Sequence, residues 1–92
     1  MLELELTSQF KRDLKKIVKQ RKNKALLDVV VEHLQRQESL HSKHKDHQLT
    51  GNWHGYRECH ITPDWLLIYK IIQNDCVQLL RLARTGSHSD LF

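Results

Sequence analysis

The run WLLIYKII at residues 65–72 constrains the fold of this chain more than any other stretch of the sequence. Seven of its eight residues are apolar or aromatic. An unbroken run of this kind is typical of a strand that is covered on both faces of a sheet. Turn sequences bound it, TPDW at 62–65 and QND at 73–75. Proline presets one backbone angle of a turn and aspartate tolerates the next position. We therefore predict a central strand over 65–72.

Three further strands are predicted around this run. GYRECHI at 55–61 precedes it and CVQLLRLAR at 76–84 follows it, each across a short turn. Strands joined by short turns pair antiparallel, so these two strands and the central strand between them form a meander. At the other end of the chain, LELEL at 2–6 alternates apolar and charged residues, which indicates a strand with one face in solvent.

The segment between the first strand and residue 38 predicts two helices. Thr7 and Ser8 can cap the first helix, which we expect from Gln9 to about Arg21. Asn23 ends this helix and can cap a second helix within 24–38, and so short a link makes the pair an antiparallel hairpin. The apolar stripes with helical spacing are Phe10, Leu14, Ile17 and Val18, then Leu26, Leu27, Val30 and Leu34. The fold class is therefore α+β: a strand, a two-helix hairpin and a three-stranded antiparallel meander.

Length and composition narrow the class of protein. We expect 92 residues to form a single domain, 1–92. The sequence contains no apolar stretch near the ~20 residues of a membrane helix. Its charged residues near the N-terminus, Glu3 and Glu5, are acidic, whereas a secretory signal would carry basic ones there. We therefore expect a cytoplasmic protein without a membrane partner. Cys59 and Cys76 are expected to stay reduced, and no Cys/His spacing predicts a metal or cofactor site.

Positive charge is concentrated in one segment. Fifteen Lys and Arg against eleven Asp and Glu give a net charge of +4, and KRDLKKIVKQRKNK at 11–24 carries most of the cations. This predicts an acidic partner, either nucleic acid or an acidic protein. The alternative is a helix face that is merely solvated.

The meander brings chemically useful residues to one end of the sheet. His60 ends one strand and meets Asp64 and Trp65 at the start of the next. Arg84 ends the third strand at the same edge. The tail TGSHSDLF leaves from there, looks too short and polar for a helix, and carries His88 and Phe92. We therefore predict a pocket with the tail as one wall.

These side chains match the chemistry of phosphodiester cleavage. An ordinary histidine titrates at about pH 6.5, so one ring can accept a proton while another donates one. Arginine matches the geometry of phosphate oxygens, and aromatic rings stack on bases. RNA brings its own nucleophile, the 2′-OH, so no metal is required. His33, His41, His44 and His54 are expected to be structural or incidental.

Two long motifs resemble a known family. KDHQLTGNWHGYRECHITPDWLLIYKI and LLRLARTGSHSDLF are similar to the YafQ branch of the RelE/ParE toxin superfamily, over essentially the whole chain. The resemblance implies a RelE-like microbial RNase fold and a ribosome-dependent endoribonuclease of a type II toxin–antitoxin pair. Such a toxin cuts mRNA in the A site of the 70S ribosome and is neutralised by a cognate antitoxin. ParE-type relatives, which target DNA gyrase, lack this histidine set.

The resemblance also implies roles for individual residues. The catalytic set is His47, His60, Asp64, Arg84 and His88, and the RNA-binding aromatic residues are Trp65 and Phe92. We favour His88 as general acid, and the sequence does not choose among His47, His60 and Asp64 as general base. Lys43 and Lys45 are expected to bind the ribosome together with the cationic segment 11–24. The rival functions are a ribosome-independent RNase and a non-catalytic RNA- or protein-binding module.

Overall fold

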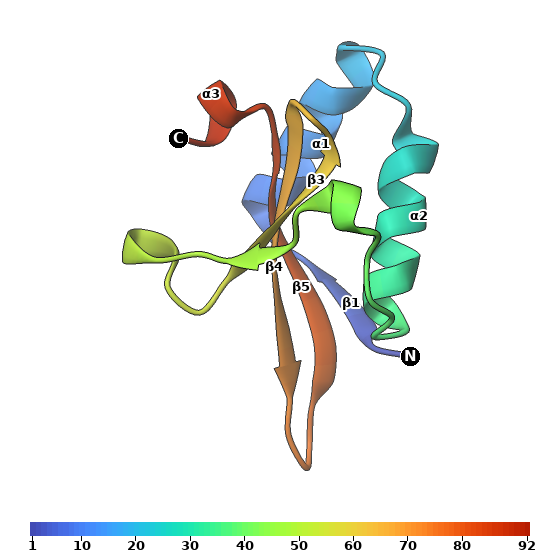
Figure 1. Cartoon of the computed structure of the whole chain (residues 1–92), viewed down its shortest axis with the longest axis vertical. Coiled ribbons are helices and arrows are strands. Elements are labelled where there is room, and N and C mark those ends of the chain that lie inside the picture. The colour runs from blue at the N-terminus through green and yellow to red at the C-terminus, as the bar shows by residue number, and fades with distance from the viewer.

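The central strand β4 (Trp65–Gln73) has neighbours on both sides, as its apolar sequence predicts. In the computed structural model, which covers residues 1–92, it is the middle strand of a five-stranded sheet of order β1-β5-β4-β3-β2 (Figure 1). The other strands are β1 (Glu3–Leu6), β2 (His47–Gln48), β3 (Arg57–Thr62) and β5 (Gln78–Gly86). β3, β4 and β5 form the predicted antiparallel meander.

The N-terminal strand lies parallel to the last strand of the meander, with Leu4 opposite Leu80 and Leu6 opposite Leu82. β1 ends at Leu6, whereas β5 continues to Gly86. The start of helix α1 (Ser8–Lys19) covers this part of the β5 edge, because the hydroxyl of its N-cap Thr7 donates a 2.9 Å hydrogen bond to the Ala83 carbonyl. The polar groups of the edge are therefore satisfied without a further strand.

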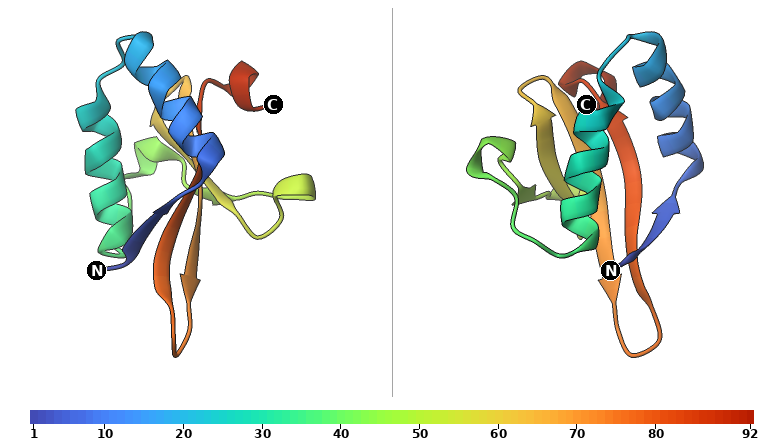
Figure 2. Two further views of the ribbon diagram at one scale, coloured as in Figure 1. Left: turned by 180° about the vertical axis from the view of Figure 1, so that it is seen from behind. Right: turned by 90° about the vertical axis from the view of Figure 1, so that its right-hand side faces the viewer.

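Both predicted helices are present and begin at the predicted caps. In α1 (Ser8–Lys19), the Thr7 side chain accepts a hydrogen bond from the Phe10 N–H, and in α2 (Lys24–Gln35) the Asn23 side chain accepts one from the Ala25 N–H. The two helices pack on the same face of the sheet (Figure 2). The larger core cluster lies between them and the sheet and includes Phe10, Ile17, Leu27, Val30, Leu34, Leu67, Tyr69 and Leu82. No helix combines the length and the apolar character that crossing a membrane requires.

The opposite face of the sheet has a smaller apolar cover. Leu66, Ile68, Ala83 and Leu91 form a separate cluster there, with Leu49, Trp53 and Tyr56 packed against it. Part of this cover comes from segment 39–53, whose sequence shows neither helical nor strand periodicity. It contains β2 and two short 3-10 helices, η1 (Ser42–His44) and η2 (Gly51–Trp53).

The prediction that the C-terminal tail forms no helix is wrong. Residues His88–Leu91 form a single helical turn, α3. Its cap explains it: the Ser87 side chain accepts a hydrogen bond from the Asp90 N–H, and the Asp90 side chain accepts one from the Ser87 N–H. Gly86 allows α3 to fold back closely, because a Cβ on it would lie 3.3 Å from the Cβ of Asp90.

A β-bulge in β5 determines which way its last residues point. Tyr69 pairs with Leu82, but the next residue of β4, Ile68, pairs with Arg84, which leaves Ala83 as an additional residue. In regular pairing Ala83 would lie opposite Ile68, and Arg84 would share a face with Leu67, beneath the helices. The bulge instead places Arg84 on the face of Ile68, so it does not lie beneath α1 and α2.

Candidate active site

A row of side chains crosses the sheet on the face opposite to α1 and α2. His47 of β2 pairs with Glu58 of β3, Glu58 pairs with Ile68 of β4, and Ile68 pairs with Arg84 of β5. Residues paired across a sheet point to the same face, and Ile68 belongs to the apolar cluster of that face. Three strand spacings of about 4.8 Å make the row about 14 Å long from His47 to Arg84. His60 lies two residues beyond Glu58 on the same face.

Glu58 lies between two imidazole rings. Its Oε1 is 3.7 Å from Nε2 of His47 and 3.7 Å from Nε2 of His60. Its side chain is 8% exposed, so a carboxylate here is shielded from water and attracts a protonated ring on either side. The sequence analysis missed Glu58. The signal was the Glu-x-His spacing on a strand, which puts both side chains on one face.

The other nitrogen of each ring faces a backbone carbonyl. Nδ1 of His47 is 2.7 Å from the Lys45 oxygen, and Nδ1 of His60 is 3.3 Å from the Pro63 oxygen. A carbonyl oxygen only accepts, so this arrangement assigns the proton of each neutral ring to Nδ1. Nε2 is then the basic nitrogen, and once protonated it can donate towards Glu58. Both rings are therefore oriented to accept a proton at Nε2.

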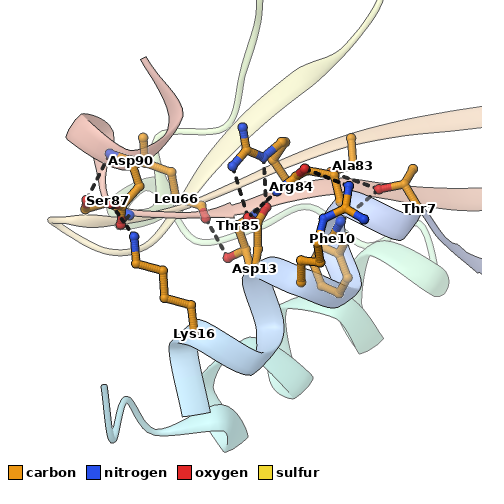
Figure 3. A network of polar contacts seen from close by, with 12 residues as sticks. Thr7, Phe10, Asp13, Lys16, Leu66, Ala83, Arg84, Thr85, Ser87 and Asp90 are labelled. Carbon is orange, nitrogen blue, oxygen red and sulfur yellow. Dashed lines mark hydrogen bonds and ion pairs between the residues drawn. The ribbon is translucent and has the colours of Figure 1, made fainter. Parts of the chain in front are cut away.

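Arg84 is held by a carboxylate from α1, as Figure 3 shows. Its Nε and Nη2 donate hydrogen bonds of 2.8 and 3.0 Å to the two carboxylate oxygens of Asp13. These bonds with Asp13 raise the pKa of Arg84 above its ordinary value. The fork leaves Nη1 without a hydrogen bond inside the protein. Asp13 was not predicted from the sequence, because it is a single acidic residue within the basic segment 11–24.

His88 is the first residue of α3, Phe92 follows the last one, and the two form an aromatic pair. Their ring centroids are 5.1 Å apart, and both residues are exposed, Phe92 to 54%. Leu91 anchors α3 in the cluster of Leu66 and Ile68, so the pair belongs to the face that carries the row. The exposed Asp64 lies in the β3–β4 turn, at the same end of the sheet as α3 (Figure 1). Neither the Asp64 nor the His88 side chain bonds to the row.

The remaining predicted site residues divide into two groups. Lys43 and Lys45 are exposed on either side of His44, whose Nδ1 lies 2.6 Å from the backbone oxygen of His60. This contact keeps both lysines next to β3. Trp65, by contrast, is 1% exposed and its Nε1 donates to the Thr85 hydroxyl. A buried ring offers no face to a base, so the prediction that Trp65 binds RNA is wrong: it is a core residue.

The predicted pocket is an open surface. No cavity in the structure is lined by His47, His60, Arg84 or His88. The structure also contains no group of three or more His, Cys, Asp or Glu side chains arranged to hold a metal ion. This open face carries two imidazoles, a buried carboxylate and an oriented guanidinium. The imidazoles can transfer protons and the guanidinium can bind a phosphate of an extended RNA chain.

Comparison with known proteins agrees with the motif resemblance. The model of the family described as "Bacterial toxin of type II toxin-antitoxin system, YafQ" matches residues 2–92. The mRNA interferase toxin YafQ of Escherichia coli strain K12 is 38% identical over 94 residues, covering 98% of this chain and 95% of the relative. A putative toxin YafQ of Haemophilus influenzae is 33% identical, covering 96% of this chain and 89% of the relative.

Solved structures give the same result. The crystal structure of YafQ from E. coli strain BL21(DE3) has a TM-score of 0.88 at 38% identity, covering 100% of this chain and 99% of that chain. A copper-bound L66S mutant toxin from Helicobacter pylori has a TM-score of 0.89 at 39% identity, covering 100% of both chains. YafQ in the E. coli DinJ-YafQ toxin-antitoxin complex has a TM-score of 0.85 at 39% identity, covering 99% and 97%. The chain therefore belongs to the YafQ family of bacterial toxins from type II toxin–antitoxin systems.

Proposed function

We propose that this chain is an mRNA interferase, an endoribonuclease that cleaves mRNA in the A site of the 70S ribosome and so inhibits translation in the cytoplasm. The observation that carries the proposal is the row of His47, Glu58 and Arg84 with the adjacent His60 on an open face. The E. coli relative that shares the family is named an mRNA interferase toxin, which supports the same activity here.

The proposed reaction uses the 2′-OH of the substrate as nucleophile. Its oxygen bonds to the adjacent phosphorus, the bond from phosphorus to the 5′ oxygen breaks, and the products end in a 2′,3′-cyclic phosphate and a 5′-OH. One protein group accepts the 2′ proton and another donates a proton to the leaving 5′ oxygen, each contributing typically ~10²–10⁴-fold. Because the substrate supplies the nucleophile, these steps need no metal.

The geometry supports an imidazole as the base. Nε2 of His47 or of His60 accepts the proton beside Glu58, which stabilises the resulting imidazolium. Asp64 has no bonded partner and remains the alternative base. His88 donates the proton to the leaving oxygen, since it lies exposed on the last turn of the chain. Arg84 binds the phosphate through Nη1, and Phe92 stacks on a base.

The ribosome and an antitoxin are the proposed partners. Lys43, Lys45 and the cationic helix α1 present exposed positive charge to ribosomal RNA. Removing Lys43 and Lys45 should reduce the salt dependence of ribosome binding by a slope of about 0.7 per lost single-strand phosphate contact. A cognate antitoxin is proposed because an E. coli YafQ is known in complex with DinJ. An acidic segment that folds on binding would complement this surface.

The test is single-turnover cleavage of a defined mRNA, with and without programmed ribosomes. We expect cleavage only on ribosomes, products with 5′-OH ends, and full activity of protein that was treated with a chelator and freed of it before the assay. His88→Ala should remove most of the rate, whereas His54→Ala, an exposed histidine outside the row, should not change it.

Other outcomes favour the rivals. Equal cleavage of naked RNA identifies a ribosome-independent RNase, and ribosome binding without cleavage identifies a binding module. A 5′-phosphate end contradicts attack by the 2′-OH. Loss of activity after the chelator treatment of the protein contradicts the metal-free mechanism, and this is a real alternative because two structures of H. pylori toxins are copper-bound and metal-bound.

A further inference from the structure

Helix α1 is linked by two polar contacts to the elements that carry Arg84 and His88. Asp13 binds Arg84 through both carboxylate oxygens. One turn later, Lys16 Nζ lies 2.8 Å from Oδ1 of Asp90 in α3 (Figure 3). The second link is an exposed ion pair, which is worth little by itself. The contact with Asp13 is different, because that carboxylate is buried.

Asp13 accepts four hydrogen bonds. Besides the two from Arg84, it accepts one of 3.2 Å from the Thr85 N–H and one of 3.1 Å from Nε2 of Gln9. The residue is 7% exposed. Burial by itself would raise the pKa of Asp13, but the bonds from Arg84, Gln9 and Thr85 outweigh it and lower the pKa. Asp13 is therefore a carboxylate at neutral pH, enclosed by donors.

The need for an acceptor at this place follows from the sheet. β1 ends at Leu6, so the outer edge of β5 beyond Leu82 has no strand beside it. The Thr85 N–H points to that edge and is satisfied by Asp13. A neutral acceptor such as an asparagine oxygen could do this alone. It could not also match the two parallel donors of a guanidinium, which require both oxygens of a carboxylate.

We propose that Asp13 is a positioning residue for RNA cleavage, which fixes the plane of the Arg84 guanidinium so that Nη1 is directed at the scissile phosphate. The inference rests on the proposed function. Asp13 does not touch the substrate, because its oxygens are fully engaged inside the protein. Without it, Arg84 keeps its charge but loses the fork that holds its orientation, and binding should suffer less than the rate of the chemical step.

Single-turnover cleavage on programmed ribosomes separates rate from binding. Asp13→Asn should lower the maximal rate about 10- to 100-fold and leave the half-saturating ribosome concentration within about twofold. Asp13→Glu, which restores two oxygens, should recover part of the rate. The control is Asp28→Asn, which breaks an exposed ion pair with Lys24 and should change neither quantity.

A double-mutant cycle and a spectroscopic signal exclude a merely structural role. If Asp13 acts through Arg84, adding Asp13→Asn to Arg84→Ala should lower the rate no further, whereas general damage to the fold would lower it again. The Nε–H resonance of Arg84 should be sharp in the wild-type protein and broadened in Asp13→Asn, and this readout does not depend on activity.

The two proposals fail in different ways. A wild-type protein that does not cleave on ribosomes refutes the proposed function, and an unchanged Arg84 resonance in Asp13→Asn then refutes the positioning role as well. A wild-type protein that cleaves, with Asp13→Asn cutting at the same rate, refutes the positioning role alone.

Discussion

The indole nitrogen of Trp65 donates a 2.8 Å hydrogen bond to the hydroxyl of Thr85, and both residues are almost inaccessible to solvent. The same hydroxyl donates to the Leu66 carbonyl. Thr85→Val keeps the shape and leaves these two polar groups without this partner, so we expect a loss of about 1–3 kcal/mol in the free energy of unfolding. Urea unfolding measures it. Thr50→Val, where no side-chain cap bond exists, is the control, and equal losses in both variants would contradict the prediction.

Glu58 should matter for activity more than its charge alone suggests. Glu58→Gln keeps the size but removes the carboxylate between His47 and His60, so ring orientation and proton uptake should both suffer. We expect the single-turnover rate to fall by up to about 100-fold. The matched control is Glu38→Gln, because Glu38 also lies beside an imidazole, that of His33, but makes no ion pair with a residue of the row. Equal rates in the two variants would remove Glu58 from the site.

The raised pKa of Tyr69 predicts that the free energy of unfolding falls at alkaline pH. Burial, together with a 2.6 Å hydrogen bond to Asp46, raises the pKa of Tyr69 well above its ordinary value of 10.0. The folded state thus favours the neutral phenol. Its contribution is complete below pH 10, the unfolded value, and is lost as the pH rises from there towards the raised pKa. Tyr69→Phe should therefore show a weaker decline of the urea midpoint above pH 10, and parallel curves for both proteins would contradict this.

The two cysteines should differ sharply in reactivity. Cys76 is exposed, whereas Cys59 is inaccessible, and burial raises the pKa of its thiol to about 12. Because the thiolate is the reactive form, a thiol reagent at pH 8 should label one site quickly and the other only after unfolding. Cys76→Ser should abolish the fast phase. A fast phase that persists in this variant would mean that β3 opens readily.

The order of β1, α1, α2, β3, β4 and β5 could be predicted because each of these elements has a strong local signal. The apolar run of β4, the helical stripes and the caps at Thr7 and Asn23 depend on neighbouring residues alone. The pairing of β1 with β5 could not be predicted, because an alternating pattern of residues does not specify which strand lies beside it. α3 was missed because a single turn has no periodicity and depends on the capping box of Ser87 and Asp90.

The candidate site was predictable in part. Motifs pointed to His47, His60 and Arg84, and the register brings these three onto one face. Trp65 was misassigned because the first residue of a strand can face either the core or the rim. Asp13 and Glu58 gave no signal by themselves, since each matters only through a partner that the sheet or the helix packing brings near.

The bulge at Ala83 gives β5 two phases within nine residues. Before the bulge the even-numbered residues Leu80 and Leu82 face the helices, and after it the odd-numbered Thr85 faces them. One strand thereby anchors the core with its first half and presents a guanidinium to solvent with its second. A redesigned strand with unbroken alternation would turn Arg84 towards the core, where a guanidinium is costly to bury, so removal of the bulge should lower both the stability of the fold and its capacity to bind phosphate.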